Sequence, residues 1–368
     1  MAEKLVIVGA GVAGVNAATK LIDNGFPGEN ITIIDMGKDP YNRKYSEVME
    51  GFLGAGGWSD GKLTYHTAIG GHMAKYCGED KAMELFDEVI TNFKRFHPKP
   101  EEVQCSDPQA EPDFIKPYFG LRLFPVWHVG TDYLHEIGKN WYDFLVENGV
   151  KFQWETKVDE IWFDENKLMA DNGSNPYFIH YDRLMFAVGK SGIDFGKKLA
   201  DKYSLPTEPK PVQVGIRFEA PQKHFQKLID ISYDFKLYRK FEEGVSLRSF
   251  CTNNNAAYVA VEETYGNHSY NGHAKKDEAF RNNMTNFGIL MEIPGIEEPF
   301  AWSRELVSKV NKEGTGLYYS PTRTPSTTSE GKDVSAVVID DAQMDEVRDA
   351  FHGYYKYIDD FIDDMKKV

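Results

Sequence analysis

The sequence predicts an α/β fold, in which a parallel sheet carries a small β-meander and is joined by an inserted antiparallel-sheet lobe and a small helical insertion. Three observations predict it. Residues 4 to 35 show a strand–helix–strand pattern with closely spaced glycines, short alternating strands run from Lys151 to Gly173, and strand-like runs separated by polar turns follow Pro206. A chain of 368 residues is long enough for two domains.

The composition is that of a globular protein. Apolar residues make up 41% of the chain, and no apolar run approaches the roughly 18 residues that a membrane span needs, so we expect no membrane partner. The net charge of −15 opposes non-specific binding to phosphate backbones and argues against nucleic acid as a partner. A local basic patch could still recognise a nucleotide or a tRNA.

The cysteine pattern predicts free thiols. Cys77, Cys105 and Cys251 lie far apart and form no CxxC pair, and no cluster of histidine, cysteine or carboxylate residues has the spacing of metal ligands. A first strand at Leu5 leaves no room for a signal peptide before it, and free thiols are typical of a reducing compartment. We therefore expect a cytoplasmic protein without a metal site.

The first motif has the order of a Rossmann-like βαβ unit, with an apolar run before a G-x-G-x-x-G pattern. In such a unit the first glycine makes the turn from strand to helix, the second lets the backbone approach a pyrophosphate, and the third lets the helix pack on the strand. An acid about 20 residues further on meets a ribose hydroxyl. The motif predicts a dinucleotide site, against a purely structural βαβ unit, with contacts from Gly9, Gly11, Ala13, Gly14 and Asp35.

A second glycine-rich stretch runs from Gly51 to Leu63. Its glycines are too dense for the interior of a helix or strand, and such clusters let backbone lie against a flat or charged group. Interleaved apolar residues such as Trp58 favour an ordered cofactor loop over a flexible one, with contacts from Gly56, Gly57, Ser59 and Lys62. Before it, Arg43 would either reach the adenosine or phosphates of a cofactor or be a solvated loop arginine.

Three segments have helical patterns. Apolar residues at helical spacing predict a helix over Asp80–Phe96, and a second helix starts at Thr131 and Asp132 and stops at Gly149. Near the carboxyl terminus one amphipathic helix is expected. Its start resembles a capping box at Asp340 and Gln343, and its apolar face carries Met344, Val347, Phe351, Tyr354, Tyr355, Ile358, Phe361, Ile362 and Met365.

The later part of the chain predicts strands. A buried strand is expected in Tyr181–Gly192, and an antiparallel lobe in Pro211–Ala220, Asp234–Phe241, Val245–Thr252 and Ala256–Gly266. On these lobe strands, Arg217 and Arg248 would either clamp a substrate carboxylate or phosphate or form salt bridges within the sheet. Cys251 is expected to be a buried thiol.

The order of these motifs resembles the FAD-dependent oxidoreductases of the glutathione-reductase-like superfamily, which has two dinucleotide-binding domains, and within it a bacterial group of NAD(P)/FAD-dependent oxidoreductases. The resemblance covers residues 4 to 327 and is carried by GAGVAG, GAGGWSDGKL, HVGTDYL, ETKVDEI, FAVGKSG, VQVGIRFEAPQ, SFC and TRTPS. The SDGKL and HVGTD motifs are more discriminating than the glycine fingerprint. The group's usual glycine-rich segment near the carboxyl terminus has no counterpart after Gly331.

The resemblance implies FAD as the cofactor and adds contacts to it. A backbone edge near the meander, Lys157–Val158, would meet the adenine, and the turn from Ala187 to Gly189 would pass near the cofactor. Asp340 would meet a ribityl hydroxyl in place of the missing glycine-rich segment. The implied division is an FAD-binding domain of residues 1–65, 125–205 and 316–368, a helical insertion of residues 66–124, and a substrate lobe of residues 206–315.

These features predict an FAD-dependent oxidoreductase that transfers a hydride between a small organic substrate and flavin N5. Lys62, His128 and Arg217 are the candidate catalytic residues, and His128 is suited to proton transfer, although a lone histidine is often structural. With no second glycine fingerprint in the sequence, NAD(P)H is expected only as a transient reductant. The alternatives are a flavin-dependent enzyme that modifies a nucleotide or tRNA, and a degenerate FAD-binding protein. The sequence does not indicate an oligomeric state.

Overall fold

The computed structural model describes residues 3–44, 47–71, 73–208, 210–264, 267–310, 318–319 and 348–368. The chain divides into two compact units. Unit 1 comprises Met1–Gly61, Glu84–Val103 and Tyr133–Thr207, and unit 2 comprises Lys62–Met83, Gln104–Asp132 and Glu208–Val368. The fold is mixed α/β, with one parallel sheet and several antiparallel sheets, as the sequence predicts.

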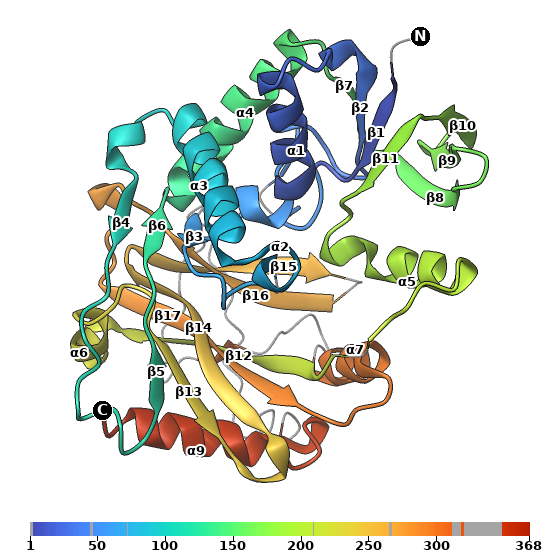
Figure 1. The fold of residues 1–368 in the computed structure, drawn as a ribbon. Coiled ribbons are helices and arrows are strands. Elements are labelled where there is room, and N and C mark those ends of the chain that lie inside the picture. Colours follow the sequence, from blue (N-terminus) through green and yellow to red (C-terminus); the bar gives the residue numbers. More distant parts are fainter. Residues whose placement is uncertain are drawn as a thin grey trace. The chain divides into compact units, whose positions relative to one another are not determined.

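Unit 1 contains the parallel sheet (Figure 1). Its strands lie in the order β11-β1-β2-β7 and have the bounds Arg183–Phe186, Leu5–Val8, Ile31–Ile34 and Lys151–Gln153. Because β1 and β2 are interior strands, their apolar residues are almost completely buried. The prediction of a buried strand after Tyr181 is wrong in one respect: β11 lies at the edge of the sheet, and the side chain of Phe186 is 40% exposed.

Helices of unit 1 pack around a buried tryptophan. These helices are α1 (Val12–Asp23) and the parts of α3 (Glu79–Phe96) and α4 (Thr131–Glu147) that belong to this unit, and both α3 and α4 confirm predicted helices. The ring of Trp141 lies 5.5 Å from that of Phe93 and 4.9 Å from that of Phe96, and its indole N–H donates to Thr19 Oγ1 at 2.7 Å. Gly149, with φ of 91°, follows α4 as expected.

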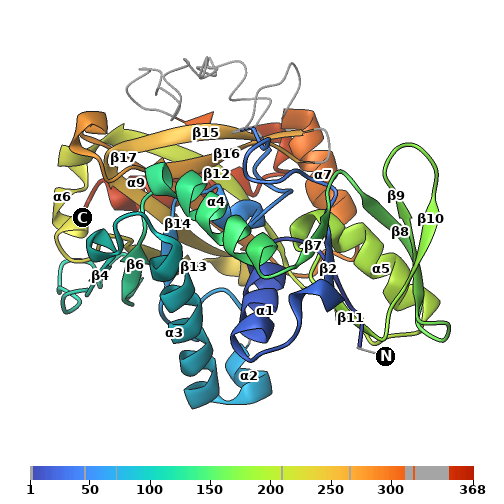
Figure 2. The same cartoon turned by 90° about the horizontal axis from the view of Figure 1, so that it is seen from above.

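The predicted β-meander is also present in unit 1 (Figure 2). Strands β8 (Lys157–Trp162), β9 (Lys167–Asp171) and β10 (Tyr177–His180) form an antiparallel sheet, and helix α5 (Ile193–Lys202) follows β11. One small core contains residues of β1, β2, the meander and α5, such as Val6, Ile34, Ile161 and Leu199. The meander is therefore joined to the parallel sheet by apolar packing.

Unit 2 is built on a six-stranded sheet in the order β18-β12-β17-β14-β13-β5. The bounds are Tyr318–Tyr319, Val212–Pro221, Met284–Ile293, Ser246–Asn255, Lys236–Lys240 and Gly120–Arg122. The neighbouring pairs are antiparallel except β12 and β18, which are parallel. The sequence predicted β12, β13, β14 and β15, but it missed β17, which pairs with both β12 and β14.

Smaller sheets and helices complete unit 2. Strands β15 (Ala257–Thr264) and β16 (Asn267–Ala274) form a ribbon, and β3 (Lys62–Thr64), β6 (Val126–His128) and β4 (Gln104–Ser106) form a three-stranded sheet. In the part of this unit that the structure describes, the helices include α2 (Met73–Cys77), α6 (Gln226–Ile229), α7 (Pro299–Val310) and α9 (Tyr355–Met365). Phe361 of α9 packs with Phe119 in the large core of this unit.

The carboxyl-terminal helix is only partly as predicted. Tyr355, Ile358, Phe361 and Met365 are buried on one face of α9, as expected, but His352 and Gly353 have positive φ angles and interrupt the helix before Tyr355. Asp340 and residues 341–347 lie outside the described residues. The packing of α9 groups it with unit 2, whereas the sequence grouped residues 316–368 with the FAD-binding domain; the predicted domain boundaries stay a prediction.

Among the described residues, no helix has both the length and the apolar character that crossing a bilayer requires.

Candidate functional site

The carboxyl ends of β1, β2 and β11 meet in unit 1. The Gly9 amide donates to the Ile34 carbonyl at 2.8 Å, and the Ala187 amide donates to the Val8 carbonyl at 2.8 Å. Three predicted contact segments, the glycine motif, the acid after β2 and the turn after β11, therefore share one edge of the parallel sheet. Ligands of open α/β sheets bind at this edge, where the connections from a central strand diverge to opposite sides.

The three glycines of the first motif have distinct geometries. Gly9 has φ of 109°, and a Cβ there would overlap the Ala187 carbonyl oxygen. A Cβ at Gly14 would overlap the Gly9 carbonyl oxygen, which confirms the predicted close packing of helix on strand. At Gly11, apart from the adjoining residues of its own chain segment, no heavy atom of the described residues lies within 4 Å of the position that a Cβ would take. Gly9 and Gly14 are required by the protein's own packing, whereas Gly11 faces open space.

Gly11 is also the N-cap residue of α1, and no side chain caps this helix. The first-turn amides of a helix have no intrahelical acceptor and carry partial positive charge. Gly14 in this turn is buried, whereas Ala13 is exposed. The open space at Gly11 therefore adjoins amides that would suit a phosphate group.

The second glycine-rich stretch lies directly against the first. The Leu53 amide donates to the Ala10 carbonyl at 2.8 Å, and Leu53 forms an isolated parallel bridge with Gly11. A Cβ at Gly54 would lie 3.3 Å from the Gly11 Cα, and one at Gly56 would overlap the Val12 side chain. The stretch is an ordered loop, as expected, and its glycines permit this close approach.

Asp35 links three segments through its carboxylate. Its Oδ2 accepts from the Ala10 amide at 2.7 Å, and its Oδ1 accepts from the amides of Gly37 and Gly51 at 2.8 Å each. An ionised carboxylate offers about four acceptor positions, so these bonds leave capacity for one more donor. Asp35 is half-buried and thus fixes the loops while keeping part of its surface accessible.

The start of the meander also adjoins Asp35. The Thr156 amide donates to the Asp35 carbonyl at 3.0 Å, and β8 begins with the next residue. In β8, Val158 is buried and Lys157 is exposed, with its ammonium 2.8 Å from Asp159. The structure therefore brings the predicted adenine edge beside the predicted ribose acid.

Of the two predictions for Arg43, the one that made it a solvated loop arginine is wrong, because the residue is only 5% exposed. Its guanidinium donates to four backbone carbonyls, and its Cζ lies 4.4 Å from the centre of the Trp58 ring. The acceptors are Glu47, Val48, Phe52 and Gly54, at distances of 2.6 to 3.0 Å. Arg43 thus holds the second glycine-rich loop in shape, and its predicted contact with a cofactor stays a prediction.

The remaining predicted contacts fall into three groups. Gly57 is buried and Ser59 is half-buried in the second glycine-rich loop. In the turn after β11, Gly189 lies two residues after Ala187 and has φ of 58°. Lys62 belongs to unit 2. Asp340 lies outside the described residues.

In unit 2, Lys62 and His128 lie directly opposite each other on the antiparallel strands β3 and β6. The Lys62 ammonium donates to the Thr252 carbonyl at 2.5 Å and lies 3.7 Å from Asp234 Oδ2. Lys236 Nζ lies 3.0 Å from the same oxygen. The structure therefore gives the Lys62 ammonium partners within unit 2, and its role toward a flavin stays a prediction.

These three side chains form a buried charged cluster, in which two ammonium groups share one carboxylate. Burial by itself would raise the pKa of Asp234, but Lys62, Lys236 and the Thr252 amide lower it to about 2. Asp234 is consequently ionised at neutral pH. The sequence indicated Lys62, but it did not indicate Asp234 or Lys236.

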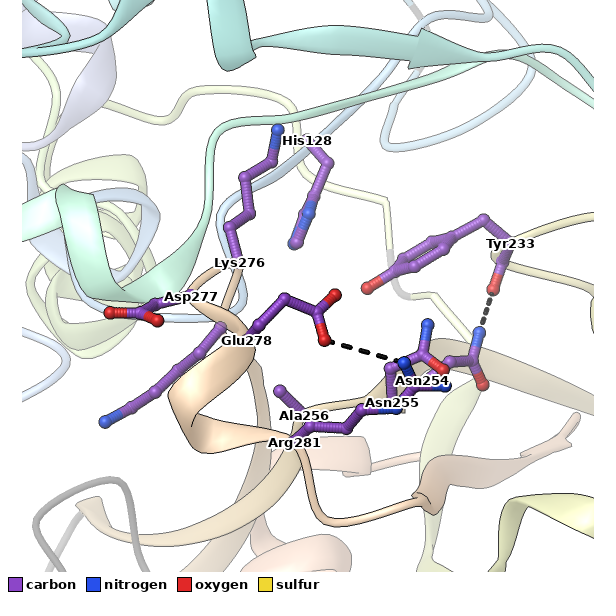
Figure 3. A pocket seen from close by; sticks show the side chains of 10 residues that line it. His128, Tyr233, Asn254, Asn255, Ala256, Lys276, Asp277, Glu278 and Arg281 are labelled. Atoms are coloured by element: carbon purple, nitrogen blue, oxygen red, sulfur yellow. Dashed lines mark hydrogen bonds and ion pairs between the residues drawn. The ribbon is translucent and has the colours of Figure 1, made fainter.

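Next to this cluster, unit 2 contains a pocket with a volume of about 170 Å³ (Figure 3). The rings of His128 and Tyr233 lie 5.2 Å apart at an angle of 39°, and both point into it. The lining residues come from β6, from the segment before β13, from the end of β14 and from the segment after β16. They are His128, Tyr233, Asn254, Asn255, Ala256, Lys275, Lys276, Asp277, Glu278 and Arg281.

The HVGTD motif, which covers His128 to Asp132, builds part of this pocket. Thr131 Oγ1 accepts from the Ala274 amide at 3.0 Å. The Asp132 carboxylate accepts from the amides of Lys276, at 3.1 Å, and Asp277, at 3.0 Å. The motif therefore supplies one wall and anchors the segment that supplies another, a role beyond starting a helix.

Arg217 is enclosed within unit 2, and its two predicted roles, as a clamp for a substrate anion or in a salt bridge of the sheet, stay predictions. It is 3% exposed, its Nη2 donates to the Cys251 carbonyl at 2.9 Å and to Asn286 Oδ1, and Gly272 covers it so closely that a Cβ there would overlap the guanidinium. This arginine is an interior group of unit 2 and does not line the pocket. Cys251, expected to be buried, is half-buried at a β-bulge with φ of 53°.

In the part of the chain that the structure describes, no group of three histidine, cysteine or carboxylate side chains could hold a metal ion.

Comparison with protein families finds no family model that matches the chain. A curated protein from Clostridium beijerinckii, described only as uncharacterized, is 28% identical over 231 residues, which are 59% of this chain. The chain spans 36% of the length of that relative.

The chain also resembles solved structures. These include a flavoprotein/dehydrogenase from Cytophaga hutchinsonii, with 14% identity and a TM-score of 0.40 over 99% of this chain and 82% of that one. Halogenase PltM has 13% identity and a TM-score of 0.37 over 83% of this chain and 55% of that one. CtdE in complex with FAD has 9% identity and a TM-score of 0.35 over 81% and 61%. Likenesses at this level are too low to transfer a function to this chain.

Proposed function

We propose that the chain is an FAD-dependent oxidoreductase that acts on a small organic substrate. The observation that carries the proposal is the arrangement in unit 1, where two glycine-rich segments, an open Gly11 and Asp35 share the carboxyl edge of a parallel sheet. A dinucleotide has the matching parts, a pyrophosphate for the amides and a ribose hydroxyl for the carboxylate.

In this proposal the chain's residues bind and orient the cofactor. The first-turn amides of α1 meet the pyrophosphate, and Gly11 lets the backbone approach it. Asp35, held by the amides of Ala10, Gly37 and Gly51, accepts from a ribose hydroxyl without moving. FAD, when bound, supplies two-electron transfer by hydride exchange at flavin N5. The superfamily, the identity of the substrate and the use of NAD(P)H as a reductant belong to the proposal.

The first experiment is an absorption spectrum of the purified protein. Yellow protein that bleaches with dithionite supports the proposal, and colourless protein that FAD does not reconstitute overturns it. Anaerobic addition of NADH or NADPH then separates an enzyme reduced by NAD(P)H from a dehydrogenase reduced by its own substrate.

A variant pair tests whether the glycine edge holds the cofactor. Gly11→Glu places a bulky negative group in the open space and should abolish flavin retention, whereas the fold should tolerate it. Gly196→Ala, in α5 of the same unit, is the matched control, because its Cβ would make only an ordinary contact of 3.8 Å with Phe186. Unchanged flavin content in Gly11→Glu would place the cofactor elsewhere.

A further inference from the structure

One residue of the second glycine-rich loop has a backbone conformation that its side chain disfavours. Leu53 has φ of 62° and ψ of 0°, close to the left-handed region that glycine adopts readily. It is the only aliphatic residue among the described non-glycine residues with positive φ, and its side chain is buried. Such a conformation persists only where the surrounding contacts impose it.

Hydrogen bonds on both sides of Leu53 impose this conformation. The Leu53 amide donates to the Ala10 carbonyl at 2.8 Å. The carbonyls of the residues before and after it, Phe52 and Gly54, both accept from the buried guanidinium of Arg43, at 2.6 and 3.0 Å. The free energy of these bonds offsets the strain at Leu53, and the backbone cannot relax without breaking at least one of them.

The strained residue lies where this loop meets the first glycine motif. Leu53 forms the isolated parallel bridge with Gly11, and a Cβ at Gly54 would lie 3.3 Å from the Gly11 Cα. The loop is therefore a wall directly beside the open space at Gly11. A relaxed Leu53 would turn the backbone that follows it, and Gly54 would move away from Gly11.

A second strained residue borders the same edge of the sheet. Glu155 has φ of 50°, and its amide donates to the Gly37 carbonyl at 2.8 Å. The next residue, Thr156, donates to the Asp35 carbonyl, while the Asp35 carboxylate accepts from Gly51 at the start of the second glycine-rich loop. Backbone strain thus occurs in two segments that adjoin Asp35, and such clustering is typical of functional sites.

We propose that Leu53 is a positioning residue for the diphosphate of the cofactor. Its left-handed conformation holds the second glycine-rich loop against Gly11 before the ligand arrives, so that binding does not have to order this loop. Leu53 acts through the loop backbone. The inference rests on the proposed function for the identity of the ligand, whereas the strain is a property of the protein alone.

Two substitutions that keep the buried volume test this role. Leu53→Ile and Leu53→Met both retain a large apolar side chain, and such exchanges are usually tolerated. They differ in branching at Cβ, and a β-branched side chain is much less compatible with positive φ. We expect FAD to bind about tenfold more weakly to Leu53→Ile than to wild type, and within about threefold of wild type to Leu53→Met.

Titration of the full chain, freed of flavin, with FAD measures these affinities through flavin fluorescence. Leu168→Ile is the matched control, because Leu168 is fully buried in the same unit but belongs to the strand β9, and it should bind FAD as tightly as wild type. ADP, which carries the diphosphate without the flavin, should show the same loss of affinity in Leu53→Ile. Circular dichroism establishes that each variant is folded.

Two results would overturn the positioning role. One is folded Leu53→Ile that binds FAD as tightly as Leu53→Met, and the other is a loss of affinity for FAD without a loss for ADP. If Leu53→Ile does not fold, Leu53→Gly and Leu53→Ala replace it. Both remove the side chain, but only glycine adopts the required φ without strain, so the glycine variant should bind FAD more tightly; equal affinities would contradict the proposal.

The same samples separate this inference from the proposed function. Wild type that binds neither FAD nor ADP overturns the proposed function. Leu53→Ile should still unfold at a lower urea concentration than Leu53→Met, and equal midpoints would show that Leu53 is not strained.

Discussion

The two candidate sites differ in the chemical groups that form them. The edge of the parallel sheet in unit 1 uses backbone amides and the space left by missing side chains, with Asp35 as its main charged group. The pocket of unit 2 uses charged and aromatic side chains from four separate segments, backed by a buried charge cluster. We therefore expect the stability of unit 1 to fall when a substitution adds volume at a packed glycine. We expect the stability of unit 2 to fall when a substitution removes a buried charge.

The largest expected effect is in unit 2. Asp234→Ala leaves the ammonium groups of Lys62 and Lys236 buried without their shared carboxylate, and it should lower the free energy of unfolding by about 3 to 5 kcal/mol. Urea denaturation followed by tryptophan fluorescence measures this change. Asp113→Ala, at an exposed carboxylate of the same unit, is the control and should change the free energy by less than about 1 kcal/mol.

The same cluster predicts a dependence of stability on pH. The pKa of Asp234 is about 2 in the folded protein and is lowered from an ordinary value of 3.8, so its contribution is complete above pH 4 and is lost as the pH falls from about 4 to 2. The contribution at neutral pH is about 2 kcal/mol. The difference in unfolding free energy between wild type and Asp234→Asn should therefore shrink across this range, and a constant difference would contradict the ionised pair.

In unit 1, two glycines of one motif should respond differently to the same added methyl group. Gly14→Ala should destabilise the protein by about 1 to 3 kcal/mol, because the Cβ overlaps the Gly9 carbonyl oxygen. Gly11→Ala enters open space at an ordinary φ of −66° and should cost less than about 1 kcal/mol. Thermal unfolding of both variants measures the difference; equal costs would mean that Gly11 is also packed.

A smaller effect than that of Gly14→Ala is expected in the loop that Arg43 holds. Arg43→Lys keeps the charge but cannot reach all four carbonyls with one ammonium group, so we expect a loss of about 1 to 2 kcal/mol. Limited proteolysis should then cut between residues 43 and 58 more rapidly than in wild type. Lys44→Gln, which changes an exposed neighbour, should leave the cleavage rate unchanged.

The sequence predicted the site of unit 1 better than that of unit 2, for a physical reason. The geometry of a βαβ turn depends on residues close together in the chain, so the spacing of Gly9, Gly11 and Gly14 was sufficient. The pocket depends on a bond between Thr131 and Ala274, 143 residues apart, and a single sequence does not contain such a pairing. The sequence shows the HVGTD motif, but it does not show which residues its polar side chains bind.

The strand β17 was missed for a related reason. It lies between β12 and β14 and is buried along most of its length, including the polar residues Thr285 and Asn286, so its sequence lacks the alternation that indicates a half-exposed strand. For the edge strand β11 the error is the opposite: its apolar sequence predicts a buried strand, because it does not show that the sheet ends there.

Asp35 has a consequence for how the loops of unit 1 move. One side chain gathers amides from residues 10, 37 and 51, so these three loops are fastened at a single point and cannot shift separately. Lengthening that side chain by one methylene, as in Asp35→Glu, would push all three outward together. The length of the Asp35 side chain therefore sets the spacing of the three loops, and with it the shape of the surface that any ligand at this edge of the sheet would contact.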